Sequence, residues 1–252
     1  MSERQDLIHG IHTVLAALRL RAGSVNEVWV DGARRDTRLA QITEAARQAK
    51  IKLHTVTQRE LDGLAPGARH QGALASCKAA PVYNEDDLAV LLEKLDEPAF
   101  LLVLDGVQDP HNLGACLRSA DAAGVHGVVV PRDRAAPITA VVRKVASGAV
   151  ESVPFFQVTN LARSLRELQS AGVWLVGAAG EGATILYEAD LRGPLALVLG
   201  GEGEGLRRLT REHCDVLVRI PMAGTVESLN VSVATGICLF EAVRQRTSAA
   251  KT

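Results

Sequence analysis

Three polar segments of the sequence follow runs of apolar residues, and their side chains could perform chemistry. Asn112 and Arg118 belong to the first segment, Glu202 to the second, and Ser228 and Asn230 to the third. Amide, hydroxyl and carboxylate groups orient a substrate by hydrogen bonds, and a guanidinium binds anions. Brought together, side chains of these types would form a polar binding or catalytic site.

Each of these residues also has a structural interpretation. Asn112 and Ser228 are suitable N-caps for the helices that follow them, and Arg118 would be a solvated helix side chain. Six positions separate Asn112 from Arg118, which puts them about 120° apart around a helix, so periodicity alone does not bring them together. The structural interpretations do not explain why a polar loop follows three strands of one predicted sheet, and this recurrence favours a site.

The second segment, Gly200-Gly201-Glu202-Gly203-Glu204-Gly205, follows a strand and opens a helix, as a nucleotide-binding loop would. Its glycines do not fit Gly-x-Gly-x-x-Gly, because Leu206 occupies the last position counted from Gly201. Two carboxylates in the turn would also repel a pyrophosphate. Glu204 has an alternative interpretation as a charge at the helix start, whereas Glu202 lies between glycines, where a backbone can approach a ligand closely. A nicotinamide-dependent dehydrogenase is therefore excluded.

Other common signatures are also missing from the sequence. No Gly-Lys dipeptide occurs, which excludes the phosphate-binding loop of ordinary NTPases. Cys77, Cys116, Cys214 and Cys238 are too far apart for a zinc motif and form no Cys-x-x-Cys pair. We therefore predict neither a bound metal nor a disulfide framework.

Alternating strands and helices are predicted to position the polar segments. After Pro98 the strands are apolar throughout and helices separate them, which is typical of a parallel sheet covered on both faces. The predicted strands are Phe100–Asp105, Gly127–Pro131, Val173–Ala178, Leu195–Gly200 and Val216–Pro221. The predicted helices are Asn112–Ala123, Ile138–Ser147, Leu161–Ser170, Gly205–His213 and Leu229–Arg246. Such sheets bind ligands beyond the carboxyl ends of their strands, where the polar segments begin.

The residues before this sheet are predicted to form a separate, smaller α/β domain and a linker. The predicted helices of the small domain are Ile8–Leu20, Thr37–Lys50 and Arg59–Leu64, and its strands are Val25–Val30, Lys52–Thr57 and Gly72–Cys77. The linker carries a short helix that begins at Asn84, a capping residue followed by three acids. We therefore divide the chain into residues 1–77, a linker at 78–98, and a sheet domain at 99–252.

Composition limits the class of protein. Of the 252 residues, 47% are hydrophobic and 23% are charged, which excludes disorder of the chain as a whole. No apolar run approaches the roughly 20 residues of a membrane span. The first six residues carry both charge signs and lack the apolar core of a signal peptide. We expect a cytoplasmic protein with no membrane partner.

The charge balance at first disfavours nucleic acid as a partner. The formal net charge is −1 and aromatic residues make up 3%, whereas a protein that grips nucleic acid by charge and stacking should be basic and aromatic. The average hides an asymmetry, however. Residues 1–80 carry 12 Lys and Arg against 8 Asp and Glu, residues 81–97 carry one against 6, and residues 98–252 carry 15 of each. The basic first segment therefore remains a candidate surface for RNA.

The three polar segments together closely resemble the motifs of the SpoU/TrmH group of RNA ribose 2′-O-methyltransferases, within the SPOUT superfamily. The resemblance includes His70-Gln71-Gly72 and covers essentially the whole chain. It implies an α/β fold in which the SPOUT parallel-sheet domain carries a C-terminal trefoil knot. It also implies a small N-terminal L30e-like α/β domain that binds the RNA substrate, and a homodimer with the site at the subunit interface.

The resemblance also implies an activity, a cofactor and the residues that serve them. The activity is S-adenosylmethionine-dependent methylation of the ribose 2′-hydroxyl of a guanosine in the peptidyl-transferase region of 23S rRNA. The implied catalytic residues are Asn112, Arg118, Glu202, Ser228 and Asn230. The implied cofactor-binding residues are Leu199, Gly200, Gly201, Ile220, Met222, Ser228 and Leu229, although relatives often carry Asn, Ser or Ala at the position of Gly201.

Several alternatives remain at this point. The substrate could be transfer RNA, read by a ribose methyltransferase of the same fold, and the chain could be a non-catalytic RNA-binding or ribosome-assembly protein. The role of Arg118 is also open, because relatives are proposed to use it as the base, yet Arg side chains normally stay protonated. Arg118 would then bind a substrate phosphate, while a water or Ser228 takes part in removing the proton.

Overall fold

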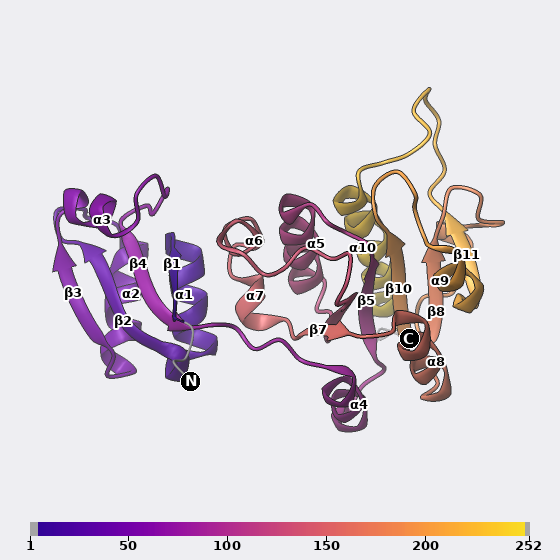
Figure 1. Ribbon diagram of the computed structural model, residues 1–252, viewed down its shortest axis with the longest axis horizontal. Coiled ribbons are helices and arrows are strands. Elements are labelled where there is room, and N and C mark those ends of the chain that lie inside the picture. Colours follow the sequence, from indigo (N-terminus) through magenta and orange to yellow (C-terminus); the bar gives the residue numbers. More distant parts are fainter. Residues whose placement is uncertain (1–4, 250–252) are drawn as a thin grey trace. The chain divides into compact units, whose positions relative to one another are not determined.

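The computed structural model describes residues 5–249, which form two compact units. The first unit comprises residues 5–81 together with residues 138–152, and the second comprises residues 82–137 and 153–249. Figure 1 shows the helices and strands of both units. No helix among the residues that the structure describes is long and apolar enough to cross a membrane.

The first unit is built on a four-stranded mixed sheet of order β1-β4-β2-β3, in which only β2 and β3 are parallel. Its strands are β1 (Gln5–His9), β2 (Val25–Asp31), β3 (Lys52–Val56) and β4 (Ala73–Lys78). Its helices are α1 (Ile11–Leu20), η1 (Ala22–Ser24), α2 (Thr37–Gln48) and α3 (Gln58–Leu64). Helices α1 and α2 share one apolar core with the sheet, and α3 packs against Trp29 and Leu74 in a separate cluster.

The prediction of a helix from Ile8 was wrong at its start. Residues 5–9 form β1, which pairs antiparallel with β4 and buries Ile8 opposite Ala75. The helix begins only at Ile11, after Gly10 has turned the chain with a φ of 95°. Ile8 fits the helical spacing of the following apolar residues, and only its pairing with a strand more than 60 positions away shows its real environment.

Residues 138–152 also belong to the first unit, where they form α6 (Ala140–Ala146) and α7 (Ala149–Ser152). Arg143 donates to Glu151 at 2.5 Å and to Asp6 at 2.9 Å, and Arg21 donates to the other oxygen of Glu151 at 2.6 Å. The sequence-based boundary placed these residues in one continuous domain at 99–252. The observed division differs because these ion pairs join distant positions and leave no periodic signal in the sequence.

The second unit is built on a seven-stranded parallel sheet of order β7-β6-β5-β10-β8-β11-β9, so the predicted parallel sheet is confirmed. Its strands are β5 (Phe100–Asp105), β6 (Gly127–Pro131), β7 (Phe155–Val158), β8 (Trp174–Ala178), β9 (Thr184–Ile185), β10 (Leu195–Gly200) and β11 (Val216–Arg219). The short strands β7 and β9 were not predicted, since a run of two to four residues gives little periodicity.

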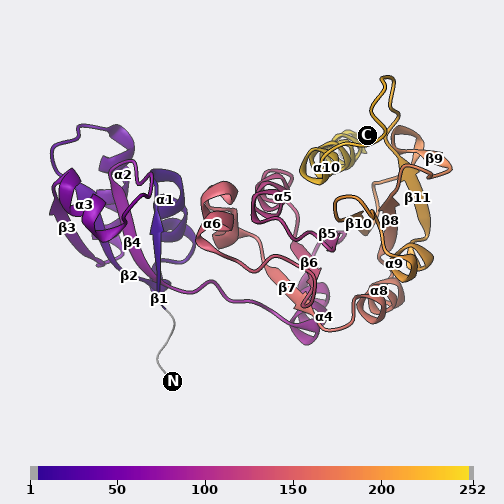
Figure 2. The same cartoon turned by 45° about the horizontal axis from the view of Figure 1, so that its top comes forward.

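Helices cover both faces of this sheet, as Figure 2 shows, with α5 and α10 on one face and α4, α8 and α9 on the other. The helices are α4 (Glu85–Lys94), α5 (Pro110–Ala122), α8 (Leu161–Ser170), η2 (Leu186–Glu188), α9 (Arg208–His213) and α10 (Val231–Ala249). The face under α8 buries Leu161, Leu165 and Leu168 against β5, β8 and β10. Burial on both faces explains why these strands are apolar throughout.

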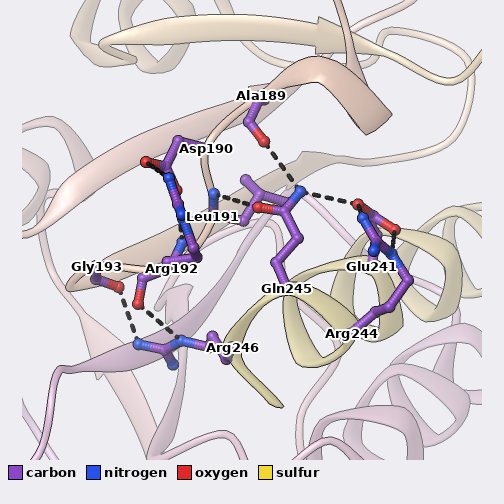
Figure 3. Close-up of polar contacts among 9 residues, drawn as sticks. All are labelled: Ala189, Asp190, Leu191, Arg192, Gly193, Glu241, Arg244, Gln245 and Arg246. Carbon is purple, nitrogen blue, oxygen red and sulfur yellow. Dashed lines mark hydrogen bonds and ion pairs between the residues drawn. The ribbon is translucent and has the colours of Figure 1, made fainter. Parts of the chain in front are cut away.

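Arg246 fixes the last turns of α10 to the amino ends of β5 and β10, and Figure 3 shows its contacts with Arg192 and Gly193, just before β10. Its guanidinium donates to four backbone carbonyls, those of Gly193 at 2.9 Å, Pro98 at 3.0 Å, Ala99 at 3.2 Å and Arg192 at 3.4 Å. It also lies 4.6 Å above the ring of Phe100. Burial lowers the pKa of Arg246 from its ordinary value, an effect that the carboxylate of Glu97 partly opposes. This contact holds the C-terminal helix across the sheet.

Candidate functional site

The candidate site lies at the carboxyl ends of β5 and β10, which are neighbours in the sheet. Gly200, the last residue of β10, pairs with Asp105, the last residue of β5. The polar segments that follow these strands therefore leave the sheet side by side. Because parallel strands end at one edge, the fold brings together loops that are about 95 positions apart in the chain.

Asp105 holds both ends of the loop that contains Glu202. At the start of this loop, the Gly201 backbone N–H donates to the Asp105 carbonyl at 2.8 Å. At its end, Arg207 donates from Nε to Asp105 Oδ1 at 2.5 Å and from its backbone N–H to Oδ2 at 3.1 Å. The Asp105 side chain is fully buried. The loop from 201 to 207 is therefore closed by one residue of the neighbouring strand.

Two glycines allow this close approach. A Cβ atom at Gly200 would lie 1.9 Å from the backbone carbon of Gly205, and one at Gly201 would lie 2.3 Å from the carbonyl oxygen of Gly106. A side chain at position 201 would therefore need a different path for the segment around Gly106. In this chain, glycine lets the two loops touch backbone to backbone.

Asn112, Glu202 and Asn230 form one hydrogen-bonded group, which we call the amide–carboxylate cluster. Asn112 Nδ2 donates to Glu202 Oε1, and Asn230 Nδ2 donates to the same oxygen at 3.0 Å. Asn230 Nδ2 also lies 3.0 Å from Asn112 Oδ1. The side-chain oxygen of Asn230, Oδ1, in turn accepts from the backbone N–H and the hydroxyl of Ser232. The three predicted polar segments thus contribute one side chain each to a single cluster.

The structural interpretation of Asn112 as an N-cap is wrong. Helix α5 begins at Pro110, and its N-cap is Asp109, whose Oδ1 accepts from the backbone N–H of His111 at 3.0 Å. Asn112 therefore lies inside the first turn, is 7% exposed, and directs its amide to Glu202. Its side chain serves the cluster and does not cap the helix.

A cavity of about 420 Å³ opens beside the cluster. It is lined mainly by polar and charged residues from the loops after β5, β6 and β10. Its charged lining residues are Asp105, Asp109, Arg134, Glu202, Glu204 and Arg207. A cavity of this size and polarity accommodates a polar organic group such as one nucleotide.

Two predicted catalytic residues lie apart from the cluster. Arg118 is exposed on α5, two turns after Asn112, and does not line the cavity. Ser228 is exposed in the loop between β11 and α10 and makes no hydrogen bond with any residue from 5 to 249. Within one chain, the structure therefore brings together three of the five predicted catalytic residues.

The residues expected to bind the cofactor lie at the end of β10 and in the loop before α10. Leu199 is buried, Ile220 and Leu229 are half-buried, and Met222 is 37% exposed. Figure 1 shows this second loop extending away from the sheet. Residues 221–229 form no hydrogen bond with the rest of the described chain. This loop therefore combines backbone groups unpaired within the described chain with half-buried apolar side chains at its two ends, Ile220 and Leu229.

The thiols show no sign of reactivity in this structure. Burial raises the pKa of Cys116 to about 11 and of Cys238 to about 12. Cys116 lies on α5 and contacts the Thr235 hydroxyl of α10 at 3.4 Å, so its role is packing. Among residues 5–249, no group of three or more His, Cys, Asp or Glu side chains is arranged to hold a metal ion.

Sequence reasoning missed the contributions of Asp105, Arg134 and Arg207. Asp105 carries a visible signal, because a carboxylate that ends a fully apolar strand needs a partner when it is buried. The partner itself, Arg207, has no such signal, since it is one of several arginines near a helix start. Arg134 lies after β6, a strand whose carboxyl end the sequence did not mark as functional.

Two family models match the chain. The SpoU rRNA Methylase family matches residues 99–240, and the RNA 2′-O ribose methyltransferase substrate binding family matches residues 7–83. Together the two matched regions cover most of each unit and include all the residues of the amide–carboxylate cluster.

Individual relatives match nearly the full length. The chain is 57% identical over 246 residues to the 23S rRNA (guanosine-2′-O-)-methyltransferase RlmB of Shewanella oneidensis, covering 98% of this chain and 100% of the relative. It is 56% identical to the protein of the same name from Escherichia coli K12, over 96% of this chain and 99% of the relative.

Solved structures are similar over nearly the same length. A crystal structure of an RNA 2′-O ribose methyltransferase is 30% identical, with a TM-score of 0.78 over 98% of this chain and 90% of that one. The SpoU methyltransferase AviRb from Streptomyces viridochromogenes, in complex with the cofactor AdoMet, is 28% identical. Its TM-score is 0.77 over 97% of this chain and 91% of that one.

Proposed function

The chain belongs to the SpoU rRNA methylase family, and we infer that it methylates the ribose 2′-hydroxyl of a guanosine in 23S rRNA with S-adenosylmethionine. The structural observation that carries this conclusion is the amide–carboxylate cluster. It joins the three segments that resemble the family motifs at the edge of a cavity large enough for one nucleotide. The curated relatives favour ribosomal over transfer RNA as the substrate.

We propose that S-adenosylmethionine binds against the end of β10 and the loop before α10. The residues that would hold it are Leu199, Gly200, Gly201, Ile220, Met222, Ser228 and Leu229. They fit the group, because residues 221–229 leave their backbone donors and acceptors unpaired within the described chain and half-buried apolar side chains flank them. When bound, the cofactor supplies an electrophilic methyl group on a sulfonium.

The chain's own residues would orient the hydroxyl that receives this methyl group. Both amides of the cluster bond to Glu202 Oε1, which leaves Oε2 without a partner among residues 5–249. We assign Oε2 to a hydrogen bond from the target ribose. Holding two reactants in line lowers the activation free energy by roughly 7–11 kcal/mol. A positioned base typically accelerates a reaction ~10²–10⁴-fold, which corresponds to about 3–5 kcal/mol. Positioning should therefore be the larger contribution of this site.

The proposed role of Arg118 has two versions, removal of the ribose proton and binding of a substrate phosphate. Both predict that Arg118→Ala loses methylation. The phosphate role needs the bidentate fork of a guanidinium, so Arg118→Lys should then lose most activity. Substantial methylation by Arg118→Lys with a shifted pH profile would instead favour the proton-transfer role.

The proposed domain roles follow the family models. We propose that residues 1–77 form an L30e-like domain that binds the RNA substrate and that residues 78–98 link it to the rest. We also propose that residues 99–252, apart from the segment 138–152 that packs with the first unit, form the catalytic domain with a C-terminal trefoil knot. In support of the knot, the segment after β11 runs back to the loop after β10, where Asn230 meets Glu202. We place the enzyme in the cytoplasm because its substrate is ribosomal RNA.

A homodimer is also proposed, with the site at the subunit interface. The loop before α10 and α10 itself leave large apolar side chains exposed in one chain. They are Met222 at 37%, Val226 at 62%, Val233 at 50% and Phe240 at 49%. Contact with a second copy would remove this apolar surface from water, which favours association.

The decisive experiment is a map of ribose methylation. Ribosomal and transfer RNA from a strain that lacks the gene should lose one 2′-O-methylguanosine in 23S rRNA, and a plasmid copy should restore it. Glu202→Gln should fail to restore it, because the carboxylate loses its charge and one acceptor site. An unchanged map in the deletion strain would contradict the proposed function. Loss of a transfer RNA site alone would favour the alternative substrate.

A further inference from the structure

The carboxylates that line the cavity differ in whether they are already occupied. Asp105 binds Arg207 through both oxygens, and Asp109 caps α5 through Oδ1. Glu202 accepts two amide hydrogen bonds at Oε1. Glu204 has no side-chain hydrogen bond or ion pair to any residue from 5 to 249. Of the four, only Glu204 therefore has both oxygens available to a ligand.

The backbone around Glu204 is constrained, and Glu204 lines the cavity. It lies between Gly203 and Gly205, whose φ angles are 83° and 64°, and a Cβ at either glycine would meet nothing within 4 Å. Its backbone N–H donates to the Glu202 carbonyl at 3.1 Å, so the turn constrains the backbone that carries both carboxylates, and both residues line the cavity.

Arg134 is the unpaired cation of the same cavity. It lies in the loop after β6, where its backbone has a φ of 63°, and its guanidinium has no partner within the described chain. The loop is fastened to the site by buried Ala136, whose backbone N–H donates to the Val107 carbonyl at 2.9 Å. The other guanidinium of the cavity, that of Arg207, is already held by Asp105.

One free carboxylate and one free guanidinium in a single cavity match the hydrogen-bonding edges of guanine. The N1–H and N2–H₂ groups of guanine are adjacent donors, which the two oxygens of a carboxylate accept together. Its O6 and N7 are adjacent acceptors, and an arginine fork donates to both. Adenine presents an acceptor at N1, which a carboxylate would repel. The pair therefore discriminates between the two purines.

We propose that Glu204 accepts hydrogen bonds from N1–H and N2–H₂ of the target guanine, that Arg134 donates to O6 and N7, and that these two residues select guanosine. The proposal rests on the proposed function, since it concerns the base of the nucleotide whose ribose is methylated. It assigns selection of the base to side chains outside the amide–carboxylate cluster.

The test compares two RNA fragments that contain the mapped site, one with guanosine and one with inosine, which lacks the 2-amino group. The wild-type kcat/KM should fall by about 10–100-fold on inosine, because a hydrogen bond to a charged group is lost. Glu204→Gln should methylate guanosine about as slowly as the wild type methylates inosine, and should barely distinguish the two RNAs. Glu188→Gln is the matched control, since Glu188 is an exposed carboxylate outside the cavity with no partner within the described chain.

Arg134 is tested in the same way with 7-deazaguanosine, which lacks N7. The wild type should lose activity on this RNA, and Arg134→Ala should not distinguish it from guanosine. Calorimetry with S-adenosylmethionine should give the wild-type affinity for both variants, which shows that they are folded.

A Glu204→Gln enzyme that keeps the wild-type preference for guanosine over inosine would overturn the proposal. So would a wild-type enzyme that methylates both RNAs equally. Failure of the proposed function is a different result, because the wild type would then methylate no RNA, including the unsubstituted fragment.

Discussion

Glu202 is the residue at which three distant segments of the chain meet. The sequence singles it out as a carboxylate between glycines, but its partners Asn112 and Asn230 are 90 and 28 positions away. Hydrogen bonds to a charged group contribute about 1.5–3 kcal/mol each, so the two amides fix the direction of this carboxylate. Its free oxygen is then presented to a substrate in one orientation, which is what catalysis by positioning requires.

Gly200 provides a test of the close backbone contact beneath Glu202. In Gly200→Ala the new Cβ would lie 1.9 Å from the Gly205 backbone, and neither atom can rotate away. We expect a loss of about 1–3 kcal/mol in the free energy of unfolding, because overpacking forces the backbone to shift. Urea denaturation measures it. Gly180→Ala is the control, since a Cβ there meets nothing within 4 Å. Equal midpoints for the two variants would contradict the close contact.

At the scale of elements, neighbouring strands position the catalytic loop. Because β5 and β10 are adjacent, Asp105 at the end of one can hold the loop that follows the other at Gly201 and at Arg207. A fully buried carboxylate destabilises the folded state unless it is paired with a cation. The Asp105–Arg207 ion pair and the conformation of the loop therefore depend on each other.

The Asp105–Arg207 pair predicts a specific cost of substitution. Arg207→Ala would leave Asp105 buried without its cation and should reduce the free energy of unfolding by about 2–3 kcal/mol. This is less than for a fully buried pair, since the Arg207 side chain is 36% exposed. Arg208→Ala is the control, because its pair with Glu212 is exposed and should contribute under about 1 kcal/mol. Chemical denaturation measures the free energy of unfolding of both variants. An equal decrease for Arg207→Ala and Arg208→Ala would argue against a structural role for the Asp105–Arg207 pair.

The anchoring of α10 is tested at its last turns. Arg246→Ala removes the hydrogen bonds to four backbone carbonyls and the contact with the Phe100 ring, and should reduce the free energy of unfolding by about 2–3 kcal/mol. Arg246→Lys should recover only part of this, since one ammonium cannot reproduce the fork. Thermal unfolding measures the effect. Arg192→Ala, whose side chain pairs with exposed Asp190, should change stability little. A melting temperature for Arg246→Ala that matches this control would refute the anchoring role.

At the scale of the whole molecule, the net charge of −1 by itself disfavours RNA as a partner. The charge distribution and the family models account for this together. The basic first 80 residues include nearly all of the region at 7–83 that matches a substrate-binding family, and the neutral segment at 98–252 contains the methylase region. A catalytic cavity for one nucleotide does not need a strongly basic surface. The few aromatic residues also fit an enzyme that binds folded RNA by shape more than by stacking on a single strand.

The proposed homodimer is tested by mass in solution. Light scattering after size-exclusion chromatography should give twice the chain mass of 26.8 kDa for the wild type. Phe240→Glu should shift the equilibrium toward one chain and reduce methylation, because it places a charge in the proposed apolar interface. Leu20→Glu is the control, since Leu20 is 57% exposed on α1 of the other unit. A wild-type mass of one chain at all concentrations would contradict the dimer.

Much of the fold was predictable from the sequence, because its signals are local. Strands β5, β6 and β10 have the predicted bounds, and helix α8 begins and ends at the predicted residues. Continuous apolar runs and helical spacing report burial of neighbouring positions, so they do not depend on the order of the strands. The short strands β1, β7 and β9 were missed because pairing with distant partners, more than local pattern, defines them.

The candidate site also combines features that local sequence patterns predict with contacts between distant residues that they do not predict. The sequence by itself determined that three polar loops follow three buried strands, and the resemblance carried by those loops indicated the family. Only the tertiary structure decided that β10 lies beside β5, which brings Glu202 to Asn112 and Arg207 to Asp105 across about 90 to 100 positions. It also placed Arg118 away from the cavity and left Glu204 and Arg134 unpaired beside it. Hydrogen bonds and ion pairs act over a few ångströms, so which charges remain free depends on strand order, and no local pattern in the sequence encodes that.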